Sequence, residues 1–306
     1  MKLFVYDKAK GHVHDDTEHY KNTVPLSQQG IKEHFEITTN PEDADYFYMG
    51  QIGNDSFEEF SPQNYKYFSQ YTNRHICDVE GEGGVPIVDW LKDSIITTMG
   101  PLKGQGIKNL FTRPTFSTLL IDNVNNKDEQ FKLPDNKTFG FRGYINCKAR
   151  AFMLYVLHND TQLEKDIHAN RVWSGPAPIG SDVHKVYIDT MLSNAISLCP
   201  RGSGIDSVRF LESCYYNRVP VVISDLDYCL VGEDQHDMDF CFRINIGDYN
   251  QKSLHDELLK IKETPYEELE DRAAKAKQYF DQVVVKYFED PTAYFLNWLS
   301  RKNERK

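Results

Sequence analysis

Short apolar runs alternate along the chain with segments in which apolar residues recur at helical spacing. Runs rich in β-branched and aromatic residues predict β-strands, and in the first part of the chain these are "LFVYD" (3–7), "ADYFYMG" (44–50), "RHICDVEG" (74–81), "SIITTMG" (94–100) and "KNLFTRP" (108–114). Two segments between them, 65–71 and 88–94, have helical spacing. Such alternation predicts a parallel sheet with helices on both faces.

A polar stretch, "NVNNKDEQFKLPDNK" (123–137), interrupts this pattern and predicts a linker. Strands and helices then alternate again, in "TFGFRG" (138–143), "NCKARAFMLYVLHND" (146–160), "HKVYIDTMLSNAISLCPRG" (184–202), "DSVRFLESCYYN" (206–217) and "VPVVISD" (219–225). The chain therefore predicts two α/β domains, 1–134 and 135–306, each with a Rossmann-like sheet.

The end of the chain predicts two helices, 266–288 and 290–306. Asp290 is expected to cap the second helix, with Pro291 as its first residue, because Pro is favoured there. Ligands of open α/β sheets bind at the carboxyl ends of the strands. Two such domains that face each other would form a deep cleft.

Composition and charge exclude several classes of protein. Hydrophobic residues make up 40% of the 306 residues, which is enough for ordinary cores, and the net charge of -11 disfavours binding to nucleic acid. The six cysteines show no Cys-x-x-Cys spacing, so we expect reduced thiols and no zinc site. No apolar run reaches the roughly 18 residues of a membrane span. These features predict a soluble cytoplasmic protein without an integral membrane segment.

Candidate chemistry is concentrated in "SLCPRGSGIDSVRFLESCYYNRVPVVISD" (197–225). A strand ends at Pro200, and Arg201-Gly202-Ser203-Gly204 then turns toward a helix that Asp206 or Ser207 can cap. The two glycines allow positive φ and a close approach of the backbone. The free N–H groups at a helix N-terminus suit a phosphate, and an arginine binds two oxygens at once.

Within the helix of this stretch, Arg209 and Glu212 are three residues apart and share a face. A carboxylate in that position can accept both hydroxyls of a ribose. The combination indicates a nucleoside diphosphate site. The spacing matches neither GxGxxG nor a P-loop, so those modes of phosphate binding are not expected.

The blocks "CPRG…RxxE…VPVVISD", together with "FVYD", "EDADYFYMG" and "FGFRG", resemble exostosin-type glycosyltransferases in their order and spacing. The resemblance is strong from Thr138 to Asp225 and patchy before Asp122. It implies a GT-B fold, in which two Rossmann-like domains face each other across a cleft. It also implies inverting transfer of a sugar from a nucleotide sugar, most often a UDP-sugar, without a bound metal or other cofactor.

The same resemblance implies roles for residues of the C-terminal domain. Arg142 would reach the diphosphate, Arg201, Gly202 and Ser203 would line the phosphate turn, Arg209 would neutralise the leaving diphosphate, and Glu212 would hold the ribose. "DLD" at 225–227 matches a metal-binding pattern but follows the last donor-domain strand, where we interpret it as a loop at the edge of the cleft.

An inverting mechanism also needs a base that deprotonates the acceptor hydroxyl. The segment "CDVEGEGG" (77–84) ends a strand of the N-terminal domain with several acids, and Glu80 and Asp78 are the first choices. The loop after the first strand, with Asp7, His14 and Asp16, is the second.

The prediction is therefore an inverting glycosyltransferase that takes a nucleotide-sugar donor and a glycan acceptor. The donor could be UDP-xylose, UDP-glucuronate, UDP-GlcNAc or UDP-galactose. Two alternatives stay open: a GT-B protein that binds a sugar nucleotide or glycan without transferring it, and another GT-B enzyme such as a sugar-nucleotide epimerase.

Overall fold

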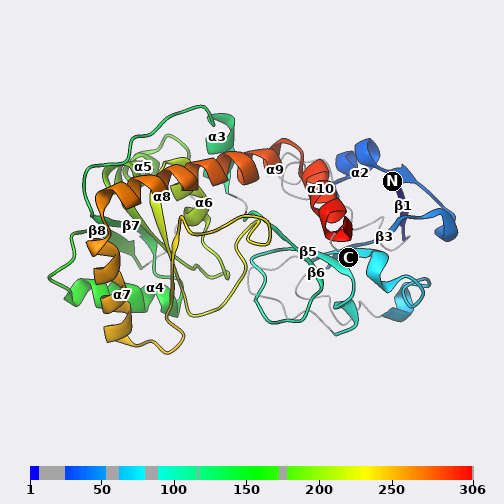
Figure 1. Ribbon diagram of the computed structural model, residues 1–306, viewed down its shortest axis with the longest axis horizontal. Helices are drawn as coiled ribbons and strands as arrows, with labels where there is room; N and C mark the ends of the chain where they lie inside the picture. The colour runs from blue at the N-terminus through cyan, green and yellow to red at the C-terminus, as the bar shows by residue number, and fades with distance from the viewer. Residues whose placement is uncertain (7–24, 53–61, 80–88, 116, 172–177, 305–306) are drawn as a thin grey trace. The chain divides into compact units, whose positions relative to one another are not determined.

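The computed structural model describes residues 1–6, 25–52, 62–79, 89–115, 117–171 and 178–304 (Figure 1). Contacts divide the chain into two compact units. Unit 1 comprises Met1–Pro114, Cys229–Gly232 and Lys286–Lys306, and unit 2 comprises Thr115–Tyr228 and Glu233–Val285. Each unit contains one parallel sheet.

The sheet of unit 1 has the order β2-β1-β3-β4-β5-β6, and every neighbouring pair is parallel. Its strands are β1 (Lys2–Val5), β2 (Glu36–Ile37), β3 (Tyr46–Ile52), β4 (His75–Val79), β5 (Ile95–Met99) and β6 (Asn109–Arg113). All of β4 is buried, as expected for a central strand of a parallel sheet. The strand order reverses between β1 and β3.

Helices from both ends of unit 1 pack together. They are α2 (Gln28–His34), α9 (Lys286–Glu289) and α10 (Pro291–Glu304). α10 contacts α2 and β6, and Phe111 of β6 packs edge-on against Phe295 and Trp298. The predicted cap is confirmed, because the Asp290 carboxylate accepts a 2.8 Å hydrogen bond from the backbone N–H of Ala293.

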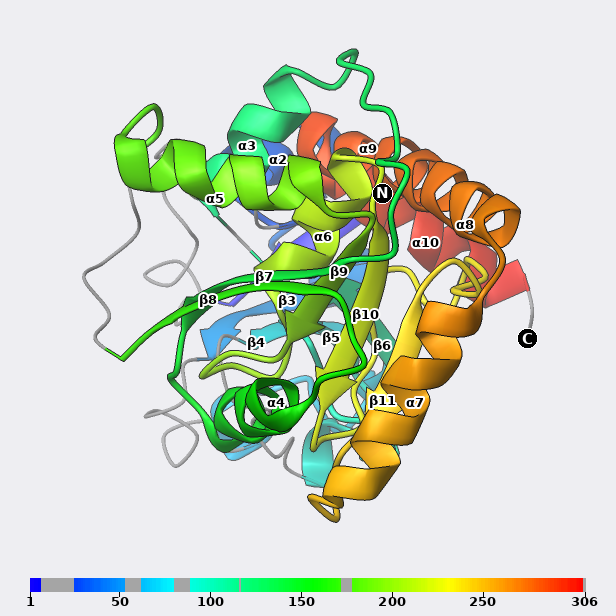
Figure 2. The same ribbon diagram turned by 90° about the vertical axis from the view of Figure 1, so that its left-hand side faces the viewer.

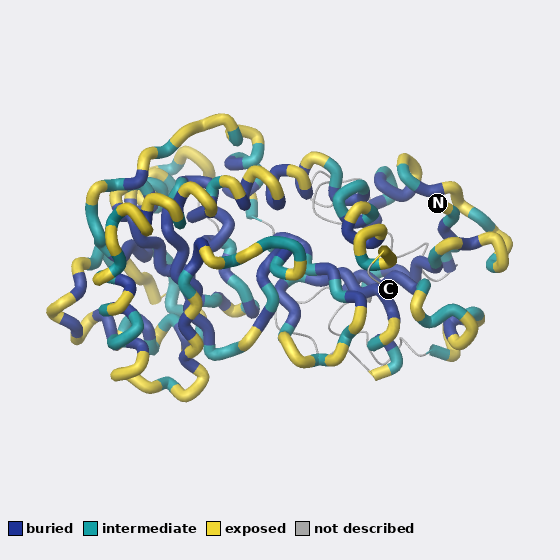
Figure 3. The backbone as a smooth tube through the Cα atoms, viewed as in Figure 1, coloured by how far each residue is buried: buried dark blue, intermediate teal, exposed yellow. Residues whose placement is uncertain are grey.

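The sheet of unit 2 has the order β11-β10-β9-β7-β8, again with parallel neighbours throughout. Its strands are β7 (Phe139–Tyr144), β8 (Lys165–Asn170), β9 (Ile196–Pro200), β10 (Val219–Ser224) and β11 (Phe242–Asn245). β9 and β10 are buried along their whole length (Figure 3). Numbered from the first strand of the unit, the order is 2-1-3-4-5, a doubly wound arrangement whose switch point lies between β7 and β9.

Helices cover both faces of this second sheet (Figure 2). One face carries α4 (Lys148–Asn159) and α7 (Gln251–Glu263), and the other carries α5 (Asp182–Ser193), α6 (Val208–Tyr215) and α8 (Tyr266–Tyr279). α3 (Thr118–Asn125) packs against α6. A π-helical segment, Phe280–Val285, follows α8 and ends where the chain passes from unit 2 into unit 1.

The two strands at the switch point of unit 2 separate before they end. β7 and β9 pair only through Phe139 with Ile196 and Gly140 with Ser197. By contrast, β7 pairs with β8 as far as Tyr144, and β9 pairs with β10 as far as Pro200. The carboxyl halves of β7 and β9 are therefore unpaired with each other, a feature that we call the β7/β9 split.

The predicted α/β class with parallel sheets is confirmed, and each predicted strand corresponds to one in the structure. Two helix predictions are wrong. The segment 65–71 forms turns, and the described part of 88–94 forms only a short 3₁₀ turn, Asp89–Leu91. The strands β8 and β11 and the helix α7 were not predicted from the sequence.

The predicted linker at 123–137 is packed against unit 2. Arg218 donates a 2.9 Å hydrogen bond to the carbonyl of Lys132, and the ring of Phe131 lies edge-on to Tyr215 and Tyr216. The two units consequently differ from the predicted domains in three places: Thr115–Pro134 groups with unit 2, whereas Cys229–Gly232 and Lys286–Lys306 group with unit 1.

Among the described residues, no helix has the length and apolar character needed to cross a bilayer.

Candidate functional site

Several arginines gather at the carboxyl edge of the second sheet. Arg201 follows the last residue of β9, and Asp225 follows the last residue of β10. The Arg201 guanidinium binds both oxygens of the Asp225 carboxylate, through Nε and, at 3.0 Å, through Nη2. Tyr249 donates a further hydrogen bond to the same carboxylate. These bonds lower the pKa of Asp225 to about 2, with the Arg201 contact as the largest cause.

Arg209 and Glu212 lie on α6 and are both buried. The Arg209 guanidinium lies over the rings of Tyr187 and Phe141, 4.5 and 5.1 Å from their centroids, and donates to the carbonyl of Arg142. The Glu212 carboxylate accepts from the Tyr187 hydroxyl and, at 3.4 Å, from Ser117. Burial raises the pKa of Glu212, and the hydrogen bond from Tyr187 and the nearby Arg209 charge oppose that rise.

A third arginine, which the sequence analysis did not single out, joins this group. Arg150 on α4 donates from Nε to the carbonyl of Arg201 at 3.0 Å and from Nη1 to the carbonyl of Tyr144 at 3.1 Å. Its guanidinium lies 5.9 Å from the centroid of the Phe141 ring, which also carries Arg209. We call Arg150, Arg201 and Arg209 the arginine cluster.

The β7/β9 split explains why arginines collect here. A parallel strand needs a partner for each backbone carbonyl, and β9 supplies none to the carboxyl half of β7. Two arginine side chains bind carbonyls there: Arg209 binds that of Arg142, and Arg150 binds that of Tyr144. The cations are thus part of the backbone pairing at the switch point.

The other predicted donor residues lie on the same edge of the sheet. Arg142 is on β7, half-buried, and contributes its carbonyl to Arg209; in the described part of the chain its own guanidinium makes no hydrogen bond or ion pair. Gly202 is buried and Ser203 is exposed, both in the turn after β9.

The turn does not use the positive φ that its glycines allow, since neither Gly202 nor Gly204 is in the left-handed region. Gly202 instead permits a close approach. A Cβ at this position would lie 3.3 Å from Nη2 of Arg150 and 3.6 Å from the side-chain nitrogen of Asn146. Glycine at position 202 therefore allows the close approach of the backbone that the sequence predicts, here to the side chains of Arg150 and Asn146.

The helix α6 begins with Ser207 as its N-cap, and the Ser207 side chain makes no capping hydrogen bond. Asp206 accepts at its backbone carbonyl from Gly202 N–H at 3.1 Å, and its carboxylate accepts from Thr115. The turn between β9 and α6 is thus tied back on itself, whereas the first N–H groups of α6 receive no cap from Ser207.

The two first choices for the catalytic base lie in or next to unit 1. Asp78 is on β4 and only 1% exposed, with its Oδ1 3.3 Å from the guanidinium of Arg113 and accepting a 2.7 Å hydrogen bond from Thr97. Glu80 lies outside the described residues, as do Asp7, His14 and Asp16.

The "DLD" segment has one carboxylate that is already bound on both oxygens. Asp225 accepts hydrogen bonds from Arg201 and Tyr249, as described above, and Asp227 lies two residues further along. Within the described ranges, no three His, Cys, Asp or Glu side chains are grouped so that they could hold a metal ion.

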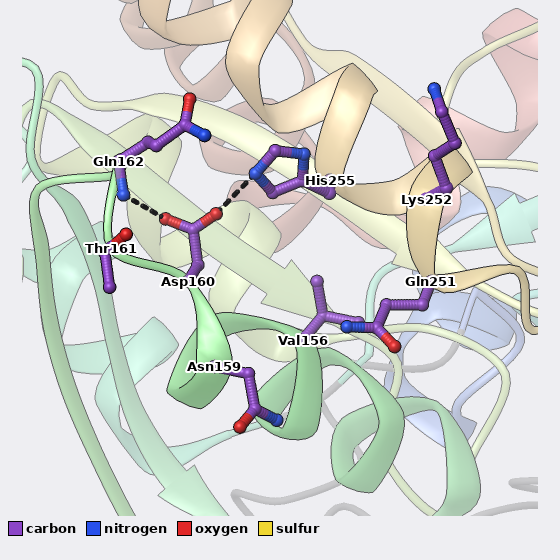
Figure 4. A pocket seen from close by; sticks show the side chains of 8 residues that line it. All are labelled: Val156, Asn159, Asp160, Thr161, Gln162, Gln251, Lys252 and His255. Carbon is purple, nitrogen blue, oxygen red and sulfur yellow. Dashed lines mark hydrogen bonds and ion pairs between the residues drawn. The ribbon is translucent and has the colours of Figure 1, made fainter.

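A separate pocket of about 440 Å³ lies between the end of α4 and the start of α7 (Figure 4). His255 contacts the Asp160 carboxylate at 2.5 Å, and the same carboxylate accepts from the backbone N–H groups of Gln162 and Leu163. This loop leads into the first residue of β8, at the amino end of that strand, so the Asp160 side of the pocket lies away from the carboxyl edge that bears the arginine cluster. Because ligands of such sheets bind at the carboxyl ends, we do not assign the donor to this pocket.

No family model matches this sequence, and no curated protein matches it with significant similarity. Among solved structures, similarity is found to the crystal structure of TarM, at 10% identity and a TM-score of 0.35, covering 76% of this chain and 57% of that one. A mutant of S. aureus TarM in complex with Fondaparinux, alpha-GlcNAc-glycerol and UDP matches at 11% identity and a TM-score of 0.41. The match covers 81% of this chain and 55% of that one. A glycosyltransferase from Rickettsia africae ESF-5 matches at 12% identity and a TM-score of 0.41, with 99% and 97% covered.

This chain spans somewhat more than half the length of the two TarM chains. At these identities and TM-scores, the similarities do not transfer residues or substrates to this protein. The candidate site therefore rests on the geometry of unit 2.

Proposed function

We propose that this protein is a glycosyltransferase of GT-B type, which moves a sugar from a UDP-sugar to a hydroxyl group of a glycan. The observation that carries the proposal is the arginine cluster at the β7/β9 split. This is the switch point of a doubly wound sheet, where such folds bind their ligands. Fixed guanidinium groups at that point suit the diphosphate of a nucleotide sugar.

Charge supports an anionic ligand. Three guanidinium groups, those of Arg150, Arg201 and Arg209, lie at this edge with three carboxylates, those of Asp225, Glu212 and Asp206. Arg142 on the neighbouring strand adds a further cation. The surplus of positive charge would be balanced by a diphosphate.

Arg201 has a double role in this proposal. It has five N–H donors, and three of them bind Asp225 and the carbonyl of Gly202, which leaves two for a phosphate. The bidentate contact with Asp225 fixes the guanidinium at the end of β9. Gly202 and Ser203 would bring backbone and hydroxyl donors to the same phosphate, and Arg209 would neutralise charge on the departing diphosphate.

Glu212 is proposed to hold the ribose. Its carboxylate is already oriented by Tyr187 and Ser117, each of which uses one oxygen. A carboxylate oxygen can accept a second hydrogen bond, so both ribose hydroxyls can still donate to it.

The chemical step proposed is an inverting displacement, in which a base removes the acceptor proton as the hydroxyl attacks the sugar. Glu80 is the preferred base, because it follows the last residue of β4 at the carboxyl end of that strand. Of the two first choices, Asp78 is ranked below Glu80, since its carboxylate is already bound to Thr97 and lies beside Arg113. Arginine side chains and the α6 N-terminus would stabilise the leaving diphosphate without a metal.

Binding and turnover of nucleotides test the proposal. UDP should raise the melting temperature of the protein in the presence of EDTA, because cations of the chain balance the diphosphate. A ligand at a hundred times its Kd stabilises a protein by about 2.7 kcal/mol. UDP-sugars should also be hydrolysed slowly when no acceptor is present.

Three outcomes would change the assignment. Absence of any UDP-dependent shift would contradict a UDP-sugar donor. A shift that requires Mn²⁺ would contradict the metal-free site. Tight UDP binding with neither hydrolysis of UDP-sugars nor transfer of a sugar to any glycan would favour the alternative, a protein that binds sugar nucleotides without transferring the sugar.

A further inference from the structure

The turn between β7 and α4 has features of a second anion site beside the turn between β9 and α6. Arg150 is half-buried and held by two carbonyls, that of Tyr144 at the end of β7 and that of Arg201 directly after β9. Those bonds use Nε and Nη1, and none of its hydrogen bonds in the described ranges uses Nη2. Nη2 points toward Gly202, where a Cβ would lie 3.3 Å away.

Among the described residues, no carboxylate forms an ion pair with Arg150. Arg201 is paired with Asp225, and Arg209 has Glu212 nearby, whereas the acceptors of Arg150 are neutral carbonyls. Arg150 and Arg209 lie over the same phenyl ring, that of Phe141. Burial lowers the pKa of Arg150, and the neighbouring Arg209 charge lowers it further. Two positive charges held this close repel each other, and a bound anion would relieve that repulsion.

Further donors surround the same point. The side-chain nitrogen of Asn146, a residue exposed in this turn, lies 3.6 Å from the Cβ position of Gly202. α4 is a twelve-residue helix whose N-cap, Cys147, makes no capping hydrogen bond. Its thiol instead donates to the carbonyl of Arg201, which also binds Arg150. The N–H groups of the first turn of α4 are thus not capped by Cys147.

We propose that the two turns divide the diphosphate between them, with Arg150, Asn146 and the N-terminus of α4 binding the distal, sugar-bearing phosphate. This assignment rests on the proposed function. Glu212 on α6 is assigned to the ribose, so the phosphate next to the ribose belongs to the turn after β9. The distal phosphate then reaches the turn after β7.

The proposal makes Arg150 responsible for the preference for UDP over UMP. Removal of one charged donor costs about ten- to a hundredfold in affinity. Arg150→Met should therefore lose UDP affinity by about that factor and bind UMP as the unaltered protein does. Affinities for UDP and UMP would be measured by titration calorimetry on the full chain, with melting temperatures taken without ligand to confirm folding.

A matched control removes a cation of unit 2 away from the split. Arg272 lies over the ring of Phe242 and pairs with Glu268. Arg272→Met should leave both affinities unchanged. Arg150→Lys, which keeps the charge but not the two-carbonyl geometry, should lower the UDP preference less than Arg150→Met.

Alkylation of Cys147 gives a test that needs no variant. Cys147 is half-buried in the proposed subsite, whereas Cys77, Cys199, Cys214 and Cys241 are buried. UDP should slow the reaction of Cys147 with iodoacetamide, and UMP at equal saturation should not. Peptide mass mapping would measure the extent of alkylation. Half-buried Cys229 serves as the internal control, with unchanged reactivity.

The results separate this inference from the proposed function. If the unaltered protein binds no UDP, both fall. If it binds UDP, two outcomes for Arg150→Met would overturn the division of the diphosphate while the donor site stands: an equal loss of UDP and UMP affinity, or no loss of either. Equal protection of Cys147 by UMP and UDP would likewise place the ribose-side phosphate in this turn and overturn the assignment.

Discussion

At the scale of single residues, the partner of each arginine decides what that arginine can do. Arg201 shares two hydrogen bonds with a carboxylate, Arg209 stacks on two aromatic rings, and Arg150 binds two backbone carbonyls. The side chains are chemically identical. Arg201 has a carboxylate acceptor and Arg209 has the Glu212 charge nearby, whereas the acceptors of Arg150 in the described ranges are neutral carbonyls, so its charge is the one best placed to attract an anion.

The Arg201–Asp225 pair predicts different effects for its two members. Arg201→Ala should weaken UDP binding by about tenfold or more while uridine binding changes little, because a charged contact to the phosphate is lost. Asp225→Asn keeps the guanidinium and should retain most of the UDP affinity. Calorimetric titration of both variants with UDP and uridine measures the difference.

The same pair also allows the opposite result. Equal losses of UDP affinity in Arg201→Ala and Asp225→Asn would mean that Arg201 acts by holding the turn after β9. In that case, the loss of uridine affinity should be as large as the loss of UDP affinity.

At the scale of elements, a buried histidine ties β4 to its neighbours in unit 1. His75, the first residue of β4, is fully buried; its Nδ1 lies 2.8 Å from the carbonyl of Tyr71, and its Nε2 lies 2.8 Å from the hydroxyl of Tyr6. A carbonyl can only accept, so Nδ1 carries the hydrogen and Nε2 accepts from Tyr6. The ring of His75 stacks on that of Phe47 at 4.8 Å. This arrangement holds the imidazole neutral.

The neutral histidine predicts a loss of stability in mild acid. Burial lowers the pKa of His75 from 6.5 to about 4. Between these values the unfolded chain binds a proton that the folded chain does not, so the free energy of unfolding falls as the pH decreases from about 6.5 to about 4. The expected loss from this group is up to about 3 kcal/mol.

Denaturant titrations at pH 7 and pH 4.5 would measure this effect. The pH-dependent loss should be smaller in His75→Gln than in the unaltered protein. His168, which is more than half exposed, provides the control: His168→Gln should keep the full loss. An identical pH dependence in the unaltered protein and in His75→Gln would exclude His75 as its source.

At the scale of the whole molecule, each unit contains a parallel sheet in which the strand order reverses once, between β1 and β3 in unit 1 and between β7 and β9 in unit 2. The proposed donor site uses the switch point of unit 2 alone. The proposed reaction needs a base as well, and the first choice for it, Glu80, belongs to the chain segment of unit 1. Binding and catalysis are therefore expected to respond to different parts of the chain.

Substitution of the proposed base separates these two functions. Glu80→Gln should reduce transfer by about 10²- to 10⁴-fold, because the amide cannot accept the proton of the acceptor. UDP affinity should be unchanged, since the nucleotide contacts proposed above all come from unit 2. Transfer rates would be measured with the UDP-sugar and acceptor found to be active.

A Glu80→Gln protein with normal transfer rates would move the role to Asp78 or to the loop with Asp7, His14 and Asp16. Asp78→Asn is a less specific probe, because it also removes a charge beside buried Arg113. A melting temperature close to that of the unaltered protein would be needed before its activity is interpreted.

The sequence alone determined the α/β class, the positions of most strands, the helices at the end of the chain and the turn that bears Arg201, Gly202 and Ser203. These features follow from local periodicity, from Gly and Pro, and from capping residues. The short turns at 65–71 and 89–91 were mistaken for helices because local spacing does not distinguish one helical turn from several.

Only the tertiary structure decided the strand order, the β7/β9 split and the partners of the arginines. Arg209 meets the carbonyl of Arg142 across 67 residues of sequence, and Arg150 meets that of Arg201 across 51. Such contacts exist because parallel strands from distant segments end at one edge of a sheet. Arg150 looked like an ordinary residue of an amphipathic helix, since nothing in its local sequence reports that the carboxyl half of β7 is not paired with β9.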